Sequence, residues 1–220
     1  MRNGNPTIDS KFRVSYFSTA YLPPVSYFIA LLKADKVLLE ANENYVKQSY
    51  RNRCNIATAN GVETLTIPTE SNNGEKIPIR DVRISKHGGW QKNHWRAINS
   101  AYRNSPYFEY LQDDFAPFYE KNWTFLWDYN YELLILILDF LSFEKTLILT
   151  KDFENEYQNM NDFRYLIHPK KESIYNLTPY YQVFDRKFGF LEDLSIMDLI
   201  FNMGNEAIPY LFHVSQEDNY

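Results

Sequence analysis

The order in which short β-rich runs and helical segments follow one another most constrains the fold of this chain. "FRVSYFST" (12–19) alternates apolar and polar residues, which is typical of a strand. Pro23 and Pro24 can open a helix whose apolar residues share one face, and "KVLLE" (36–40) predicts a short buried strand. A strand, a helix and a strand in this order favour an α/β fold.

The segment 45–68 predicts a β-hairpin. Asn60-Gly61 is a strong turn signal, and the residues after it are rich in β-branched side chains. We expect the hairpin to occupy about 50–68 and a further strand to run over "IPIRDVRIS" (77–85).

Helical patterns dominate the second half of the chain. Ser195 can cap one helix, and Gly204 can end it. The other expected elements are a helix at 90–103, shorter helical pieces near Pro106 and Pro117, a long buried helix at about 120–143, and strands at 146–150 and 180–184. Residues 151–178 are charged and show no convincing period.

Together these elements predict one α/β domain over residues 12–212: a single mixed domain with short strands, a β-hairpin and several packed helices. No internal repeat or low-complexity linker divides the chain. We expect residues 1–11 to be disordered and residues 213–220 to form a polar tail.

Charge is unevenly distributed along the chain. Residues 44–103 contain ten Lys and Arg against four Asp and Glu, whereas residues 104–220 contain eight against twenty. A basic segment of this kind predicts an anionic partner. Its excess of positive charge is too small, and too mixed with acids, for duplex nucleic acid.

Other features limit the class of protein. The single cysteine, Cys54, excludes an intramolecular disulfide and a multi-cysteine zinc site. The first eleven residues lack the apolar core of a cleavable signal. The most apolar stretch (133–141) is far shorter than the roughly 20 residues of a membrane-spanning helix. We therefore expect a soluble, cytoplasmic protein without a membrane span.

The first half of the hairpin segment carries a run of hydrogen-bond donors. On a strand, alternate side chains share a face. One face would present Lys47, Ser49, Arg51 and Arg53, and the other Gln48, Tyr50 and Asn52. Two arginines and a lysine on one face can hold a phosphate or carboxylate by charge-assisted hydrogen bonds. The alternative is a solvated edge strand whose charges prevent aggregation.

His94 is the candidate general base. It lies on an otherwise apolar stripe of the expected helix at 90–103, so it is either a buried structural histidine or a base at the edge of a pocket. The other histidines have no metal-ligand spacing, and we predict no metal. Cys54 is either a nucleophile or a small apolar filler. No glycine-rich phosphate loop or nucleophile-elbow motif is present, and we expect no cofactor.

Aromatic residues make up 17% of the chain and are candidates for ring contacts. Tyr and Trp combine an apolar ring with a polar tip, which suits a sugar, although filling the core is the commoner role. "PYYQVF" (179–184) could supply such an edge through Tyr181 and Gln182, or could be an ordinary strand. Tyr21 and Trp95 are the other candidates for contact with the ring of a ligand.

The chain resembles the WbqC-like protein family. Five stretches match in family order: "YLPPVSYF" (21–28), "YVKQSYRNRCNI" with "NGVETLTIP" (45–68), "DVRIS" (81–85), "HWRAINSAYRNSPYF" (94–108) and "FGFLEDLSIMDLIFNMG" (188–204). Pro24 and Ser26 stand where many members have Trp and Gly. Residues 151–178 stand where longer members have a glycine-rich segment.

The resemblance implies a role in surface polysaccharide or O-antigen biosynthesis, with glycine or other acyl transfer onto an activated sugar. In that reading the ligand is a nucleotide-linked or phosphorylated sugar, Arg51 and Arg53 hold its phosphate, and His94 deprotonates the acceptor. Two alternatives are a non-catalytic module that binds such a precursor and a scaffold protein without a ligand.

Overall fold

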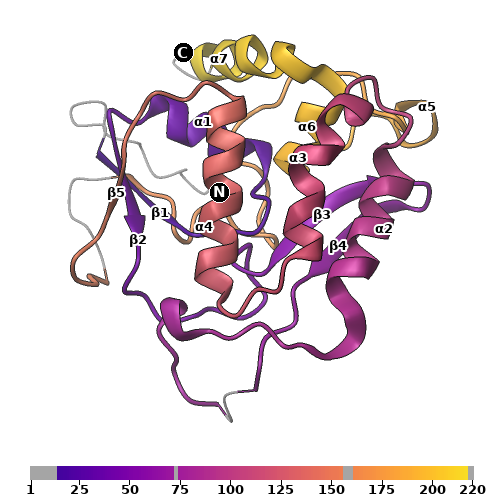
Figure 1. Ribbon diagram of the computed structural model, residues 1–220. Coiled ribbons are helices and arrows are strands. Elements are labelled where there is room, and N and C mark those ends of the chain that lie inside the picture. The colour runs from indigo at the N-terminus through magenta and orange to yellow at the C-terminus, as the bar shows by residue number, and fades with distance from the viewer. Residues whose placement is uncertain (1–13, 72–73, 156–160, 218–220) are drawn as a thin grey trace, which may run out of the picture.

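The computed structural model describes residues 14–71, 74–155 and 161–217 and confirms the predicted mixed α/β fold (Figure 1). Its main sheet contains four parallel strands, β1 (Val14–Ser18), β2 (Lys36–Glu40), β5 (Leu147–Leu149) and β6 (Asn161–Asp162), in the order β5-β2-β1-β6. Residues 1–11, expected to be disordered, lie outside the described ranges.

Helix α1 (Val25–Lys33) connects β1 to β2. Its extended N-cap residue is Pro24, as the sequence predicts, because a proline can precede a helix but cannot continue one. Seven consecutive residues of α1, Val25 to Leu31, are buried. The helix therefore lies inside the domain, where it packs against the two last α-helices, α6 (Ile196–Met203) and α7 (Ala207–Glu217).

The remaining helices complete the domain. They are α2 (Trp90–Tyr102), α3 (Phe108–Glu120), α4 (Leu126–Phe140), α5 (Asp185–Phe188) and the short 3₁₀ helices η1 (Ile79–Asp81), η2 (His87–Gly89) and η3 (Gly204–Glu206). Ser195 caps α6 by accepting a hydrogen bond from the Met197 amide, and α6 ends at Gly204, as predicted. Residues 213–217, expected within a polar tail, continue α7 and bury Val214. No helix in the described ranges has the length and apolar character that a bilayer crossing requires.

A separate two-stranded hairpin consists of β3 (Arg53–Thr58) and β4 (Gly61–Thr66). Its turn is the predicted one, and Gly61 has φ of 102°, a conformation that favours glycine. In Figure 1 the parallel sheet occupies one side of the view and the hairpin with α2 the other, with α4 and α3 between them. Many of the aromatic residues fill this interior, and Tyr21, Tyr102 and Tyr129 are fully buried.

Three predicted strands are wrong. Within 77–85, Ile79 and Val82 are both buried although they are three positions apart. On a continuous strand they would face opposite sides of the sheet. The chain forms η1 there instead. Residues 180–184 form no strand. Residues 47–52 form turns: Gln48 has φ of 59°, and the Ser49 hydroxyl donates to the Val46 carbonyl at 2.6 Å. The predicted alternation of donors at 47–53 therefore does not occur.

Candidate functional site at the carboxyl edge of the parallel sheet

The carboxyl ends of β1, β2 and β6 meet at one edge of the parallel sheet. From β1 the chain proceeds to β2 and β5 on one side, and it then crosses to place β6 on the other side of β1. Ligands of open α/β sheets bind outside the carboxyl ends of strands at such a reversal of direction. The junction of β1 and β6 is therefore the place where the topology favours a ligand site.

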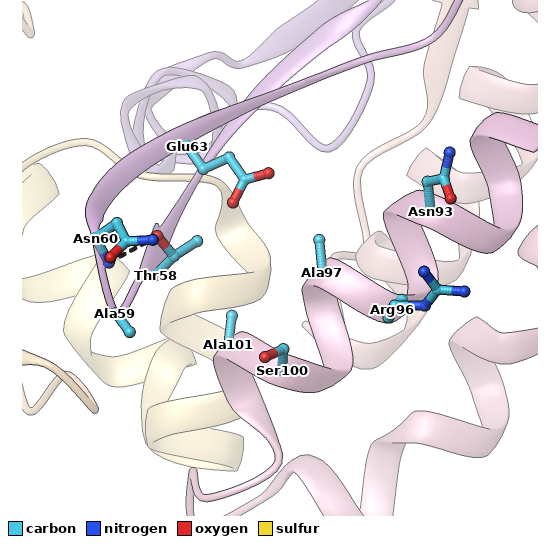
Figure 2. A pocket seen from close by; sticks show the side chains of 9 residues that line it. All are labelled: Thr58, Ala59, Asn60, Glu63, Asn93, Arg96, Ala97, Ser100 and Ala101. Atoms are coloured by element: carbon cyan, nitrogen blue, oxygen red, sulfur yellow. Dashed lines mark hydrogen bonds between the residues drawn. The ribbon is translucent and has the colours of Figure 1, made fainter. Parts of the chain in front are cut away.

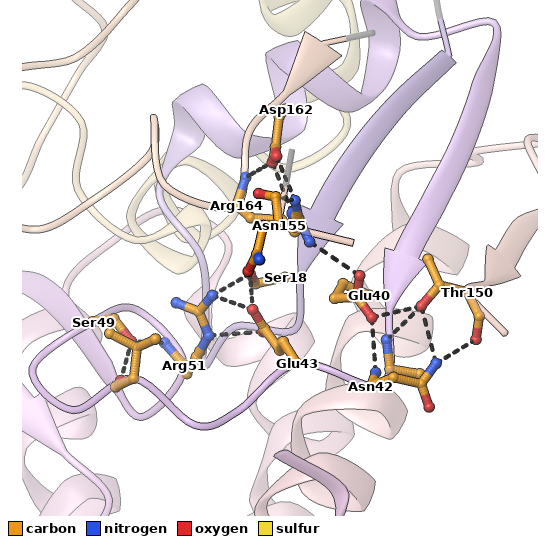
Figure 3. A network of polar contacts seen from close by, with 12 residues as sticks. Ser18, Glu40, Asn42, Glu43, Ser49, Arg51, Thr150, Asn155, Asp162 and Arg164 are labelled. Atoms are coloured by element: carbon orange, nitrogen blue, oxygen red, sulfur yellow. Dashed lines mark hydrogen bonds and ion pairs between the residues drawn. The ribbon is translucent and has the colours of Figure 1, made fainter. Parts of the chain in front are cut away.

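Arg51 and Glu43 form a buried ion pair at this edge (Figure 3). The guanidinium donates from Nε to Glu43 Oε1 at 2.8 Å and from Nη2 to Glu43 Oε2 at 2.5 Å. Nη2 also donates to the hydroxyl of Ser18, the last residue of β1, at 2.6 Å. The two side chains are only 3% and 0% exposed. Nη1 has no hydrogen-bond partner among the described residues, so Arg51 keeps a donor that could bind a ligand.

Arg164 forms a second buried network beside the first (Figure 3). It donates to both carboxylate oxygens of Asp162, at 2.9 and 2.6 Å, and to Glu40 Oε2 at 3.1 Å. Burial alone would lower the pKa of Arg164, but the hydrogen bonds and charge of Asp162, with the charge of Glu40, raise it overall. Buried pairs of this kind are weak contributors to stability, because desolvation offsets the attraction.

A small cavity of about 10 Å³, room for about one water molecule, lies between these two networks. Its lining includes Thr19, Tyr50, Arg51, Phe163 and Arg164. The Thr19 hydroxyl oxygen is buried and has no hydrogen-bond partner in the part of the chain that the structure describes. A buried hydroxyl without a partner costs about 1–3 kcal/mol, so a water molecule or a ligand group that completes its hydrogen bonding in this cavity is favoured.

His94 lies in the core, away from this cavity's lining. Its Nδ1 is 3.0 Å from the Tyr21 hydroxyl, which is also 3.1 Å from the Tyr119 hydroxyl. Burial lowers the pKa of His94 to about 4, and a hydrogen bond to the Thr66 backbone only partly opposes this shift. The ring is therefore neutral at pH 7, and its Nδ1 contacts the Tyr21 hydroxyl inside the core.

The other residues expected to bind substrate lie in several places. Lys47 and Tyr181 are exposed, and Arg53 is half-buried at the start of β3. Three side chains form hydrogen bonds within the protein: Ser49 donates to the Val46 carbonyl, Asn52 to the Ile67 carbonyl and the buried Gln182 to Asp198. Trp95 stacks on Tyr119. The structure thus brings only Tyr50 and Arg51 of the expected set to the cavity.

Two further questions raised by the sequence concern the reactivity of Cys54 and metal binding. Cys54 is fully buried, and burial raises the pKa of its thiol, which makes it a filler and a poor nucleophile. Within the described ranges no group of three or more His, Cys, Asp or Glu side chains could hold a metal ion.

A larger hollow lies elsewhere, between the hairpin turn and α2 (Figure 2). Its volume is about 360 Å³, and its lining includes Asn60, Glu63, Arg96 and Ala97. Its charged lining side chains, Glu63 and Arg96, are both exposed, and no described hydrogen bond or ion pair holds either of them. We favour the sheet edge despite its smaller cavity, because buried charges and an unpartnered buried hydroxyl converge there.

Sequence reasoning missed several residues of this site, among them Thr19, Glu40, Glu43 and Arg164. One signal was available for two of them. "FST" and "KVLLE" place polar or charged residues at the carboxyl ends of two buried strands, where the ends of parallel strands meet. Arg164 comes from the irregular 151–178 segment, which gave no comparable signal.

Comparison with known proteins identifies the family. The WbqC-like protein family matches residues 19–176, well over half of the chain, a range that includes Thr19, Arg51 and Arg164. Uncharacterized protein Rv1507c of Mycobacterium tuberculosis is 27% identical over 230 residues, covering 93% of this chain and 99% of that protein. No solved structure matches the chain. The chain belongs to the WbqC-like protein family.

Proposed function

We propose that this protein binds an activated, phosphate-bearing sugar at the carboxyl edge of its parallel sheet and transfers an acyl or aminoacyl group onto it. The step would belong to surface polysaccharide biosynthesis, the role that resemblance to the family implies. The observation that carries the proposal is the buried Thr19 hydroxyl without a partner, in a cavity between two buried arginine–carboxylate networks.

The polar groups that line this cavity suit a sugar hydroxyl. A hydroxyl can both donate to and accept from a sugar hydroxyl, so Thr19 can fix the orientation of the ring. Arg51 Nη1 can donate a charge-assisted bond to an oxygen of the ligand while its other nitrogens stay bound to Glu43. Tyr50 gives the cavity an aromatic wall.

The first prediction concerns Thr19→Val, which removes the hydroxyl and keeps the shape. Because that hydroxyl has no partner in the free protein, the variant should be as stable as the wild type or about 1 kcal/mol more stable. Binding of a nucleotide-sugar should weaken about tenfold, the loss of one hydrogen bond. Thermal unfolding with and without a panel of nucleotide-sugars and sugar phosphates measures both effects.

Thr178→Val, at an exposed threonine, is the matched control and should change neither stability nor binding. A Thr19→Val protein that binds every member of the panel as tightly as the wild type would refute the site. Incubation of the wild type with the bound sugar and activated amino acids, followed by mass measurement, tests the transfer itself.

The placement of His94 supports a second candidate, a non-catalytic module that binds a sugar precursor. The expected base is buried, contacts the Tyr21 hydroxyl through Nδ1 and does not line the cavity. Binding of a nucleotide-sugar without any product of altered mass would favour this candidate over the transferase.

A further inference from the structure

Two segments distant in sequence meet next to the sheet-edge cavity. Lys170 donates from Nζ to Gln48 Oε1 at 2.9 Å, which joins the donor-rich turn at 47–52 to the segment that follows β6. That segment also lines the cavity through Phe163, Arg164 and Ile167. The contact therefore brings Lys170 beside the turn that places Tyr50 and Arg51 in the same lining.

His168 and Lys171 lie on the same short stretch. The His168 ring accepts a hydrogen bond at Nδ1 from the Lys170 amide at 3.2 Å, which leaves Nε2 as the other polar atom of the ring. Lys171 donates from Nζ to the Tyr165 carbonyl at 2.8 Å. Each ammonium group has three hydrogens, so Lys170 and Lys171 both keep donors for a ligand.

The charges that act on His168 are all positive. Burial lowers the pKa of the imidazole, and the charges of Lys171, Lys170 and Arg51 lower it further. No carboxylate is among these causes. The Arg51 charge is largely matched by Glu43, whereas Lys170 and Lys171 have no described ion-pair partner. The surroundings of His168 therefore favour a bound anion.

We propose that Lys170, Lys171 and His168 form, with Gln48, a phosphate-binding site beside the sheet-edge cavity, and that it holds the phosphate or pyrophosphate of the sugar precursor. The inference rests on the proposed function and changes which residues bind the phosphate. Arg51 serves the cavity and Glu43, and Arg53 has no part in the site. The phosphate contacts come from the 168–171 stretch, within the segment where longer family members have glycines.

A ring contact accompanies this site. The Tyr165 side chain is 42% exposed, and the guanidinium carbons of Arg51 and Arg164 lie 5.7 and 5.6 Å from its ring centroid. The two buried arginines thus hold the ring in place while part of its surface faces solvent. A base or sugar attached to the phosphate can pack on this ring, whereas free phosphate cannot.

Calorimetric titration with inorganic pyrophosphate and, separately, with uridine diphosphate glucose tests the site. The wild type should bind both ligands, and the Lys170→Gln/Lys171→Gln double variant should bind each at least tenfold more weakly. Binding by the wild type should weaken as salt rises, with a smaller salt dependence in the double variant. Tyr165→Ala should weaken uridine diphosphate glucose and leave pyrophosphate unchanged, which separates the ester from the free anion.

Lys36→Gln is the matched control, because Lys36 is an exposed lysine at the amino end of β2, the opposite edge of the sheet. It should bind both ligands as the wild type does. In nuclear magnetic resonance titrations, pyrophosphate should raise the pKa of His168 in the wild type, a response that a merely structural histidine would not give.

Wild-type pyrophosphate affinity in the double variant would overturn the phosphate site, as would a wild type that does not bind pyrophosphate. If the double variant binds uridine diphosphate glucose normally while Thr19→Val does not, only this inference fails. If neither the wild type nor any variant binds a nucleotide-sugar or sugar phosphate, the proposed function fails as well.

Discussion

The charged guanidinium of Arg51 is buried, and it forms two hydrogen bonds to the carboxylate of Glu43. Glu43 is fully buried and accepts these two hydrogen bonds from Arg51. Each charge is tolerated only because the other is present, since an isolated buried charge is far more costly than a pair. At this position, stability and the proposed ligand binding therefore depend on the same side chain.

A double-mutant cycle at this pair is the next prediction. Arg51→Met should destabilise the protein by about 3–5 kcal/mol, because Glu43 is left buried and unpaired. Arg51→Met with Glu43→Leu should recover most of that loss, since apolar side chains of similar size often replace a buried pair without cost. Urea unfolding of the two single variants and the double variant gives the coupling energy. A single variant within 1 kcal/mol of the wild type would show that the pair is solvated.

At the scale of elements, β6 depends on Arg164 more than on its own length. It has two residues and, among the described residues, pairs with β1 alone. Arg164 links β6 to β2, because its guanidinium binds both Asp162 in β6 and Glu40 at the end of β2. The guanidinium also donates to the carbonyls of Glu154 and Asn155, so one side chain attaches this irregular segment to the sheet.

Arg164→Lys should loosen this segment without unfolding the domain, because an ammonium group cannot reproduce the five-donor geometry of a guanidinium. Hydrogen exchange at the Phe163 amide, which donates to the Tyr16 carbonyl at 2.9 Å, should accelerate at least tenfold. Amides in the β1–β2 ladder are the internal reference and should exchange at wild-type rates. Equal protection of Phe163 in both proteins would contradict the role of Arg164.

Elements with local signals were predictable, and those that depend on distant partners were not. Pro24 before α1, Asn60-Gly61 in the hairpin and Ser195 before α6 act within a few residues, and all three predictions are confirmed. The turns at 47–52 were missed because polar residues there suit an edge strand equally well. β6 and the Arg164 network were missed because they form only when residues 161–164 reach strands more than a hundred positions earlier.

At the scale of the whole molecule, two buried groups oppose each other in their response to pH. Burial lowers the pKa of His94 to about 4 and raises that of Asp198 to about 6, the latter despite hydrogen bonds from Tyr180 and Gln182. Unfolded His and Asp titrate near 6.5 and 3.9. Between pH 4 and 6, unfolding therefore adds a proton to His94 and removes one from Asp198, and their contributions to the pH dependence cancel.

Single variants should reveal the separate contributions of His94 and Asp198 to the slope of the free energy of unfolding against pH. Relative to the wild type, His94→Gln should lose stability as pH rises from 4 to 6, because only the release of the Asp198 proton remains. Asp198→Asn should gain stability over the same range, because only proton uptake by His94 remains. Each slope should be about 1.4 kcal/mol per pH unit. Urea unfolding at several pH values measures them, and the double variant should again parallel the wild type; parallel curves for all four proteins would contradict the assigned burial.

The pairing of Glu40 with Arg164 has a consequence for synthesis, since 124 positions separate the two residues. At about 5–20 residues per second, the ribosome makes Arg164 on the order of 6–25 seconds after Glu40. During that interval a βαβ unit made of β1, α1 and β2 would bury the Glu40 carboxylate before the Arg164 guanidinium that binds it has been made. The nascent chain is therefore expected to keep this sheet edge open until translation is well advanced, so that the sheet-edge cavity closes among the last parts of the domain.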